Sequence, residues 1–238
     1  MTLKLFELNG IDLTPFTRRI TDVQSADVEA LDELGIELKS LSEVSPGVRT
    51  VLWSGIVTDM TAYLKLRKEM FGSASKVLKT SANRQMNITG LKAESTTDLK
   101  DQTKTGLTLT LFAADPLEYN VTQSAEEITV EARGDQITIL NNGEAPTTPD
   151  WQLTALDEII DPVLSDSKGN MMAWDGTLNT GDVLKFAGST TLLNGAEAGG
   201  IIGEMLRAAP GSNIITYNDS DNSSHSCTLK AMWRDAYY

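Results

Sequence analysis

The segment Gly106-Leu107-Thr108-Leu109-Thr110-Leu111-Phe112, followed two residues later by Asp115-Pro116-Leu117-Glu118-Tyr119, decides the fold class of this chain. Its leucines and threonines alternate, so the leucines face one side of an extended chain and the threonines face the other. This pattern predicts a half-buried β-strand. Pro116 has no backbone N–H and restricts Asp115 to extended geometry, so the strand must end before it and the chain must turn out of its sheet.

Other β signals lie on the N-terminal side of this strand. Asn9-Gly10 separates two alternating runs and predicts a hairpin. Residues 48–57 are rich in β-branched and apolar side chains around Trp53, which predicts a central strand covered on both faces. The polar residues 94–105 predict a mobile loop or arm between strands.

One segment of the N-terminal half predicts a helix. Thr58 or Asp59 can cap it, residues 60–71 are rich in helix formers, and Gly72 ends it. The helical period places one broad apolar face on this segment, formed around Arg67 by Met60, Tyr63, Leu64, Met70 and Phe71.

The C-terminal half alternates short strands with turns. Strands are predicted at residues 128–132, 136–140, 151–156, 171–174, 183–186, 214–217 and 227–231. Arg133-Gly134-Asp135 lies between the first two and predicts a hairpin. Regular short strands separated by turns are typical of a β-sandwich or jelly roll.

Length and composition narrow the possible functions. The 238 residues are long enough for two domains. A net charge of −13 and the lack of a basic stripe disfavour a nucleic-acid binder, because phosphate neutralisation needs clustered Lys and Arg. Cys227 is the single cysteine, which excludes an intrachain disulfide and a cysteine-based zinc site. No apolar run approaches the roughly 18 residues that span a bilayer, and a cytoplasmic site of synthesis and assembly is expected.

Three segments, in this order, resemble the distal tail protein of siphophages, the ring that joins the tail tube to the baseplate or tip. They are the alternating strand that ends in residues 115–119 (DPLEY), residues 136–153 (QITILNNGEAPTTPDWQL), and residues 209–217 (APGSNIITY) leading to 227–238 (CTLKAMWRDAYY). In the family, the first motif is Asp-Pro followed by an aromatic residue. In this chain Leu117 intervenes, and the aromatic residue is Tyr119.

The resemblance implies a mainly β, two-domain subunit of a homohexameric ring. Residues 1–122 would be a β-rich, ring-forming domain with one helix, and residues 123–238 a galectin-like β-sandwich. The subunit would be a structural virion protein at the tail tip, with a central channel for DNA and contacts to the tail tube, the tail hub or fibre, or the tape measure. No enzymatic activity, sequence-specific nucleic-acid binding or membrane insertion is implied, and the helix residues named above become candidate ring contacts.

Residues that could carry chemistry are few. His225 lies in a polar turn-like stretch, which favours a surface loop residue over a catalytic base. Cys227 lies in the predicted last strand, where we expect a small buried apolar residue rather than a nucleophile. The acidic stretches 175–182 and 219–222 lack the order of a calcium-binding loop. We therefore predict no catalytic residues, no cofactor and no metal site.

Two functions of other classes remain as alternatives. A carbohydrate-binding β-sandwich would use Trp174 or Trp233 to stack on host glycans. A β-sandwich glycoside hydrolase would need two facing carboxylates, about 5 to 9.5 Å apart. Within the structural class, a tail-tube protein is a competitor, although residues 123–238 would be superfluous in a minimal tube subunit.

Overall fold

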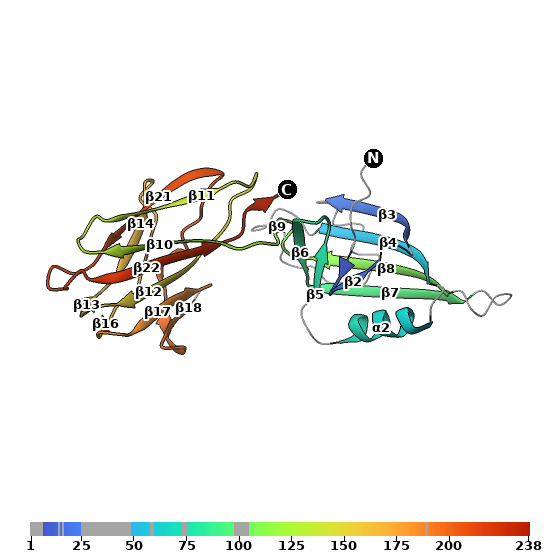
Figure 1. Cartoon of the computed structure of the whole chain (residues 1–238), viewed down its shortest axis with the longest axis horizontal. Coiled ribbons are helices and arrows are strands. Elements are labelled where there is room, and N and C mark those ends of the chain that lie inside the picture. The colour runs from blue at the N-terminus through green and yellow to red at the C-terminus, as the bar shows by residue number, and fades with distance from the viewer. Residues whose placement is uncertain are drawn as a thin grey trace. The chain divides into compact units, whose positions relative to one another are not determined.

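The computed structural model of the chain describes residues 7–13, 15, 17–24, 49–57, 60–72, 76–97, 105–188 and 190–238. The chain divides into two compact units, Met1–Val121 and Thr122–Tyr238, and each has its own hydrophobic core. The described residues form antiparallel sheets and a single α-helix (Figure 1). The predicted mainly β class is confirmed.

The first unit contains a four-stranded antiparallel sheet built around the segment that decided the fold class. Its strands follow the order β3 (Thr17–Gln24), β4 (Arg49–Val57), β8 (Thr105–Ala113) and β7 (Gly90–Thr97). Leu107, Leu109 and Leu111 of β8 are buried, as their alternation predicted, and β8 ends at Ala113 before the proline. Trp53 of β4 lies opposite Leu109 and is fully buried.

A second sheet of the first unit contains four short strands and β9. The order is β2 (Ile11–Asp12), β1 (Glu7–Leu8), β5 (Lys76–Lys79), β6 (Arg84–Ile88) and β9 (Glu118–Asn120). Asn9 and Gly10 have φ angles of +47° and +81°, so the predicted hairpin between β1 and β2 is confirmed. Leu8, Leu78 and Met86 of this sheet share one core with the leucines of β8.

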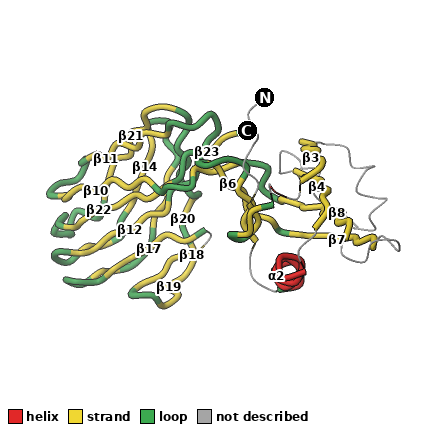
Figure 2. Tube along the Cα trace, turned by 45° about the vertical axis from the view of Figure 1, so that its right-hand side comes forward, coloured by secondary structure: helices red, strands yellow, loops and turns green. Residues whose placement is uncertain are grey.

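The predicted helix is α2 (Met60–Phe71), drawn in red in Figure 2. At its end, the Gly72 N–H donates to the Lys68 carbonyl. Leu66 supplies its described core contact, with 2% of its surface exposed, whereas Leu64 is 54% exposed. Residues two positions apart on a helix point to nearly opposite sides, so Leu64 points away from the core that Leu66 contacts. The side chains of Met60, Tyr63, Met70 and Phe71 lie outside the described part. Among the described residues, no helix is long and apolar enough to cross a membrane.

Two further predictions for the first unit are corrected. Leu52 of β4 is 38% exposed and the other residues on its face are half-buried, so this central strand is fully covered on one face and only partly covered on the other. Residues 94–97, expected in a loop, continue β7 because they pair with β8 as far as Thr97 and Thr105. Polar side chains such as Glu94 fit the open face of the same sheet, and local polarity therefore did not reveal the strand.

The chain leaves β8 through a corner whose residues bond to one another. The Leu117 N–H donates to Asp115 Oδ1 (3.1 Å), and the Tyr119 hydroxyl donates to Asp115 Oδ2 (2.6 Å). An aspartate that accepts a bond from the N–H two residues on is a common turn former. Asp115 and Tyr119 thus fix the turn that Pro116 imposes.

Arg49 of β4 ties this corner to the four-stranded sheet. Its Nη2 lies 2.9 Å from Glu118 Oε1, and its Nη1 donates to the Pro116 carbonyl (3.2 Å). Arg49 and Glu118 are 3% and 4% exposed, so the ion pair is buried. Such a buried pair holds the corner in one position relative to β4, because either buried charge without its partner would destabilise the fold.

The second unit is a sandwich of two antiparallel sheets. One sheet has the order β10 (Ser124–Val130), β22 (Cys227–Trp233), β12 (Asp150–Ala155), β17 (Val183–Ala187), β18 (Thr190–Leu193) and β19 (Ala196–Gly200) (Figure 2). The other has the order β11 (Gln136–Asn141), β21 (Gly211–Asn218), β14 (Val163–Asp166), β15 (Met171–Ala173) and β20 (Ile202–Gly203). Short strands β13 (Ile159–Ile160) and β16 (Thr177–Leu178) pair with each other, and β23 (Ala236–Tyr237) ends the chain.

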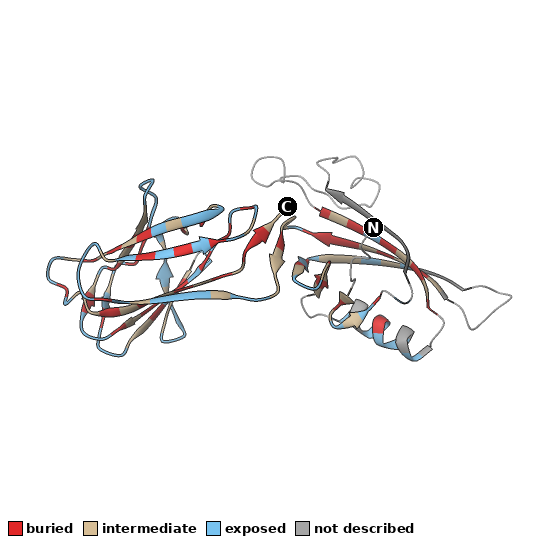
Figure 3. Ribbon diagram, turned by 45° about the horizontal axis from the view of Figure 1, so that its top comes forward, coloured by how far each residue is buried: buried red, intermediate tan, exposed pale blue. Residues whose placement is uncertain are grey.

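Both sheets contribute to one core. Trp151 and Leu229 from the first sheet belong to the same buried cluster as Ile139 and Tyr217 from the second. Buried residues alternate with exposed ones along β11 and with half-buried ones along β22, and Figure 3 shows such alternation in the strands of this unit. The period-two pattern in the sequence therefore identified the faces correctly.

The predicted hairpin at Arg133-Gly134-Asp135 is wrong. Gly134 has a φ of +88° and the chain turns there, but β10 pairs with β22 and β11 pairs with β21, in different sheets. The turn carries the chain across the core. Asp135 Oδ2 accepts bonds from the N–H groups of Glu131 and Ala132, which hold the turn without strand pairing.

The Asn141-Asn142-Gly143 segment closes the other end of β11. Asn141 is 1% exposed, and its Nδ2 donates to the carbonyls of Ala145 (2.9 Å) and Ala208 (3.0 Å). Gly143 lies against the backbone of Ala236, where a Cβ atom would meet the carbonyl oxygen at 2.1 Å. Glycine is therefore required here for close approach of two backbones.

Arg49→Ala should destabilise the first unit by about 3 to 5 kcal/mol, because it leaves Glu118 as a buried unpaired charge. Urea unfolding of the full chain measures the change. Lys92→Ala is the control: its ion pair with Glu94 lies on the surface and should contribute less than about 1 kcal/mol. Equal losses for the two variants would contradict a structural role for the buried pair.

Candidate functional site

Among the residues that the structure describes, the outward face of the five-stranded sheet in the second unit carries no charged side chain. We call it the uncharged face. Strand pairing places its members side by side, since Thr138 lies opposite Ile214 and Ser165 lies opposite both Thr216 and Met171. Its residues are Gln136, Thr138, Leu140, Val163, Ser165, Met171, Ala173, Ile202, Ser212, Ile214, Thr216 and Asn218.

Four large apolar side chains are exposed on this face. Leu140, Met171, Ile202 and Ile214 are between 45% and 51% exposed. Single exposed apolar residues need no explanation, but several on one sheet face that lacks charge are typical of a protein contact surface. The uncharged face is therefore the candidate docking surface of this unit.

The outward face of the six-stranded sheet has a different composition. Lys230 and Glu127 form an ion pair there (3.3 Å). Asp150, Lys185 and Glu197 also lie on this face, in register with its central residues. This second face is a solvated one, so the lack of charge on the other is not a general property of the sandwich.

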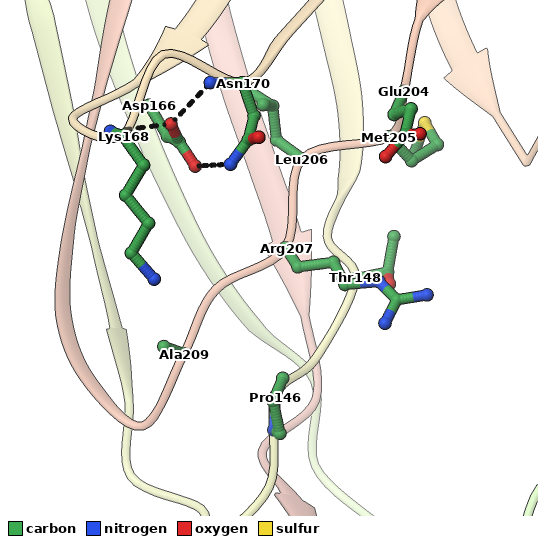
Figure 4. Close-up of a pocket in the computed structure, with 10 residues that line it drawn as sticks. All are labelled: Pro146, Thr148, Asp166, Lys168, Asn170, Glu204, Met205, Leu206, Arg207 and Ala209. Carbon is green, nitrogen blue, oxygen red and sulfur yellow. Dashed lines mark hydrogen bonds between the residues drawn. The ribbon is translucent and has the colours of Figure 1, made fainter. Parts of the chain in front are cut away.

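A pocket of about 430 Å³ with a mixed polar and apolar lining lies in the second unit (Figure 4). The β14–β15 turn, the segment between β20 and β21, and the loop before β12 contribute its walls. Its lining residues are Pro146, Thr148, Asp166, Lys168, Asn170, Glu204, Met205, Leu206, Arg207 and Ala209. This volume lies in the range of sites for small molecules.

Asp166 organises the turn at the edge of this pocket. Its carboxylate accepts bonds from the N–H groups of Lys168 and Asn170 and from Asn170 Nδ2, at 2.7 to 2.9 Å. Partial burial alone would raise the pKa of Asp166, but these bonds and the nearby Lys168 charge lower it below its usual value. The carboxylate stays ionised, and its oxygens are occupied by the turn.

His225 belongs to a partly buried hydrogen-bond network rather than to a freely solvated loop. Its Nδ1 lies 2.6 Å from Asp219 Oδ1, and the Tyr217 hydroxyl donates to Asp219 Oδ2 (2.8 Å). The Asp219 side chain is fully buried, while that of His225 is 27% exposed. Arg133 pairs with the exposed Asp221 beside this network. The arrangement fastens the 219–225 loop to β21.

Cys227 is fully buried, as predicted, and contacts the Tyr217 hydroxyl. Burial raises the pKa of the Cys227 thiol to about 12 and raises that of Tyr217 well above its usual value. Both groups are neutral at physiological pH. The thiol is therefore a poor nucleophile.

The two tryptophans of the glycan-binding alternative lie in the core. Trp174 and Trp233 are 8% and 6% exposed, and Trp174 Nε1 donates to the Ala198 carbonyl (2.8 Å). Gly176 lies against the Trp174 ring. Neither indole offers a face on which a sugar could stack. Among the residues that the structure describes, no group of three or more His, Cys, Asp or Glu side chains is placed to hold a metal ion.

Sequence analysis missed both the uncharged face and the pocket. The face had a signal, because the predicted strands 136–140, 171–174 and 214–217 contain no charged residue. The pocket had none, since Lys168 and Arg207 are 39 positions apart and nothing local marks either as a lining residue.

No protein-family model matches the sequence, and no curated protein matches it. The crystal structure of SPP1 Dit (gp 19.1), described as a paradigm of the hub adsorption apparatus in phages that infect Gram-positive bacteria, matches with a TM-score of 0.63. The match covers 98% of this chain and 99% of that chain, at 12% sequence identity. The chain has the Dit fold. The resemblance to distal tail proteins that the sequence motifs indicated is thus confirmed at the level of the fold.

Asp219→Ala should lower the free energy of unfolding by about 3 kcal/mol, because it leaves the buried Tyr217 hydroxyl without its acceptor. Asp221→Ala is the matched control, since its side chain is 86% exposed and its loss should change stability by less than about 0.5 kcal/mol. Urea unfolding followed by tryptophan fluorescence measures both. A control as damaging as the test variant would assign the effect to surface charge instead.

Proposed function

We propose that this chain is a structural subunit of a phage tail, located at the tail tip, where it forms the distal ring or baseplate hub between the tail tube and the host-adsorption apparatus. The observation that carries the proposal is the fold, which corresponds to that of SPP1 Dit over nearly the whole of both chains. The role is mechanical and requires no catalysis or cofactor. The subunits assemble into a hexameric ring around a channel for DNA.

The distribution of charge between the units supports this role. The second unit holds 17 acidic and 6 basic residues, whereas the first holds 16 acidic and 14 basic. Copies of the nearly neutral first unit can approach one another with little like-charge repulsion. The first unit is accordingly the ring-forming domain, and the acidic second unit is the galectin-like sandwich that faces other components.

Each unit also offers an apolar contact. Leu64 on α2 is exposed in the first unit and belongs to the candidate ring contacts with Met60, Tyr63, Met70 and Phe71. The uncharged face of the second unit provides a surface where another tail protein can dock without burying unpaired charge. The neighbours would be the tail-tube protein on one side and the hub, fibre or tape-measure protein on the other.

The full chain, purified alone, should form a particle with six times the mass of the 25.8 kDa chain. Light scattering measures the mass, and negative-stain images should show six-fold rings with a central channel. A chain that stays monomeric at high concentration, even with the tail-tube protein present, would contradict the ring.

Leu64→Gln and Ile214→Gln should separate the two contacts. Leu64→Gln is expected to shift rings to monomers, whereas Ile214→Gln should leave rings intact and weaken retention of the neighbouring tail protein in a pull-down. Both side chains are exposed, so both variants should keep the parent's unfolding transition. Each serves as the control for the other, and intact rings in Leu64→Gln would remove α2 from the ring contact.

A further inference from the structure

The two sheets of the second unit end in four edge strands within the described residues, and β11 differs from the other three. Proteins usually protect an edge strand from pairing by charge, by a bulge or by short length. β10 carries Glu126 and Glu127, β19 carries Glu197 and has a register shift against β18, and β20 is two residues long. β11 has six residues in continuous register with β21, and it contains neither a charged residue nor proline.

The backbone of β11 uses alternate residues to bond to β21. The Tyr217 N–H of β21 donates to the Asp135 carbonyl (2.9 Å), one residue before β11 begins. In an antiparallel pair, every second residue directs its N–H and C=O groups to the same neighbour. Ile137 and Ile139 therefore direct their backbone groups to β21.

The backbone groups of Gln136, Thr138 and Leu140 point to the opposite side, which we call the β11 edge. No hydrogen bond joins these N–H and C=O groups to a described residue. The three side chains are exposed on the uncharged face. Because the donors and acceptors repeat at the spacing of a β-strand, the group that complements them is the backbone of another extended chain.

Charge around the β11 edge indicates which kind of chain fits. β11 itself is neutral, but Glu131 lies before it, Glu144 lies after it, and both are exposed. The second unit as a whole has 17 acidic and 6 basic residues, so like-charge repulsion opposes the approach of a second copy. A neutral strand with basic residues at its ends avoids this repulsion and places cations near the two glutamates.

We propose that the β11 edge binds an extended segment of another protein, which adds one strand to the five-stranded sheet. The segment is neutral over the length of β11 and basic at its ends. Its backbone forms about six hydrogen bonds with Gln136, Thr138 and Leu140. This inference names the mode of contact for the docking role proposed for the uncharged face, and it rests on that role.

Hydrogen exchange of the full chain, followed by NMR, tests the β11 edge before any partner is added. The amides of Ile137 and Ile139 should be protected by their bonds to β21. Those of Thr138 and Leu140 should exchange about 100-fold faster, because they are open to water. Equal protection of all four amides would show that another chain or another part of this chain already covers the edge, and it would overturn the proposal.

The probe for binding is a synthetic peptide of alternating threonine and valine with a lysine at each end. A length of about nine residues places the lysines beyond both ends of β11. Titration should show saturable binding with a dissociation constant on the order of 1 mM, together with new protection of the Thr138 and Leu140 amides.

Two control peptides separate backbone pairing from charge. The same peptide with a central proline should not bind, because proline removes a donor and restricts the backbone. Glutamate in place of both lysines should weaken binding, and high salt should reduce that difference. Equal binding by either control peptide, or no saturable binding of the probe, would contradict the proposal.

Thr138→Pro should weaken binding of the probe about 10-fold, because it removes an N–H group of the β11 edge. Proline is tolerated on an edge strand where the N–H faces solvent, so urea unfolding should remain close to that of the parent chain. Thr138→Val is the matched control, since it keeps the N–H group and the β-branched shape, and it should bind like the parent. If Thr138→Pro lowers stability, the peptide with the central proline makes the same test from the partner's side.

These results are separable from the hub proposal. Rings that do not bind the probe would disprove the β11 edge alone. A chain that binds the probe and never forms rings would keep the edge and contradict the ring. Loss of the neighbouring tail protein in Ile214→Gln without any loss in Thr138→Pro would assign the contact to the sheet face and remove it from the edge.

Discussion

A β-strand packed on a core exposes only every second side chain, and this constraint governs both units. In the sandwich, the inward positions of both sheets fill with residues such as Trp151, Leu229 and Tyr217, so charged side chains are confined to outward faces, edges and turns. An outward face can accommodate charged side chains, yet the described residues of the uncharged face include none. This is why the face is informative about contacts, whereas the charged face of the opposite sheet is not.

The few charged groups that do enter the interior are tied to corners of the chain. Arg49 and Glu118 join β4 to the turn that follows β8, and Asp219 holds the loop after β21 through Tyr217 and His225. A buried charge is tolerated where its partner is fixed, and it then fixes the position of both segments. The motif residues 115–119 are thus explained by architecture, without any chemistry at a ligand.

The functional assignment rests on different observations for each unit. The similarity of the fold to that of SPP1 Dit supports the hub proposal. The concentration of acidic residues after residue 121 supports separate roles, with ring formation proposed for the first unit and contacts to other components proposed for the second.

The sequence alone determined the features that depend on near neighbours. Alternation identified β8, Asn9-Gly10 identified a hairpin, and helix formers with Gly72 identified α2, because propensity, period and turn geometry act within a few residues. Tertiary structure decided the rest. The same turn residues serve a hairpin or a crossing between sheets, so only long-range pairing placed β10 and β11 in different sheets. Tertiary packing buries Leu66 and leaves Leu64 exposed. The pocket forms because the fold brings together side chains that are distant along the chain.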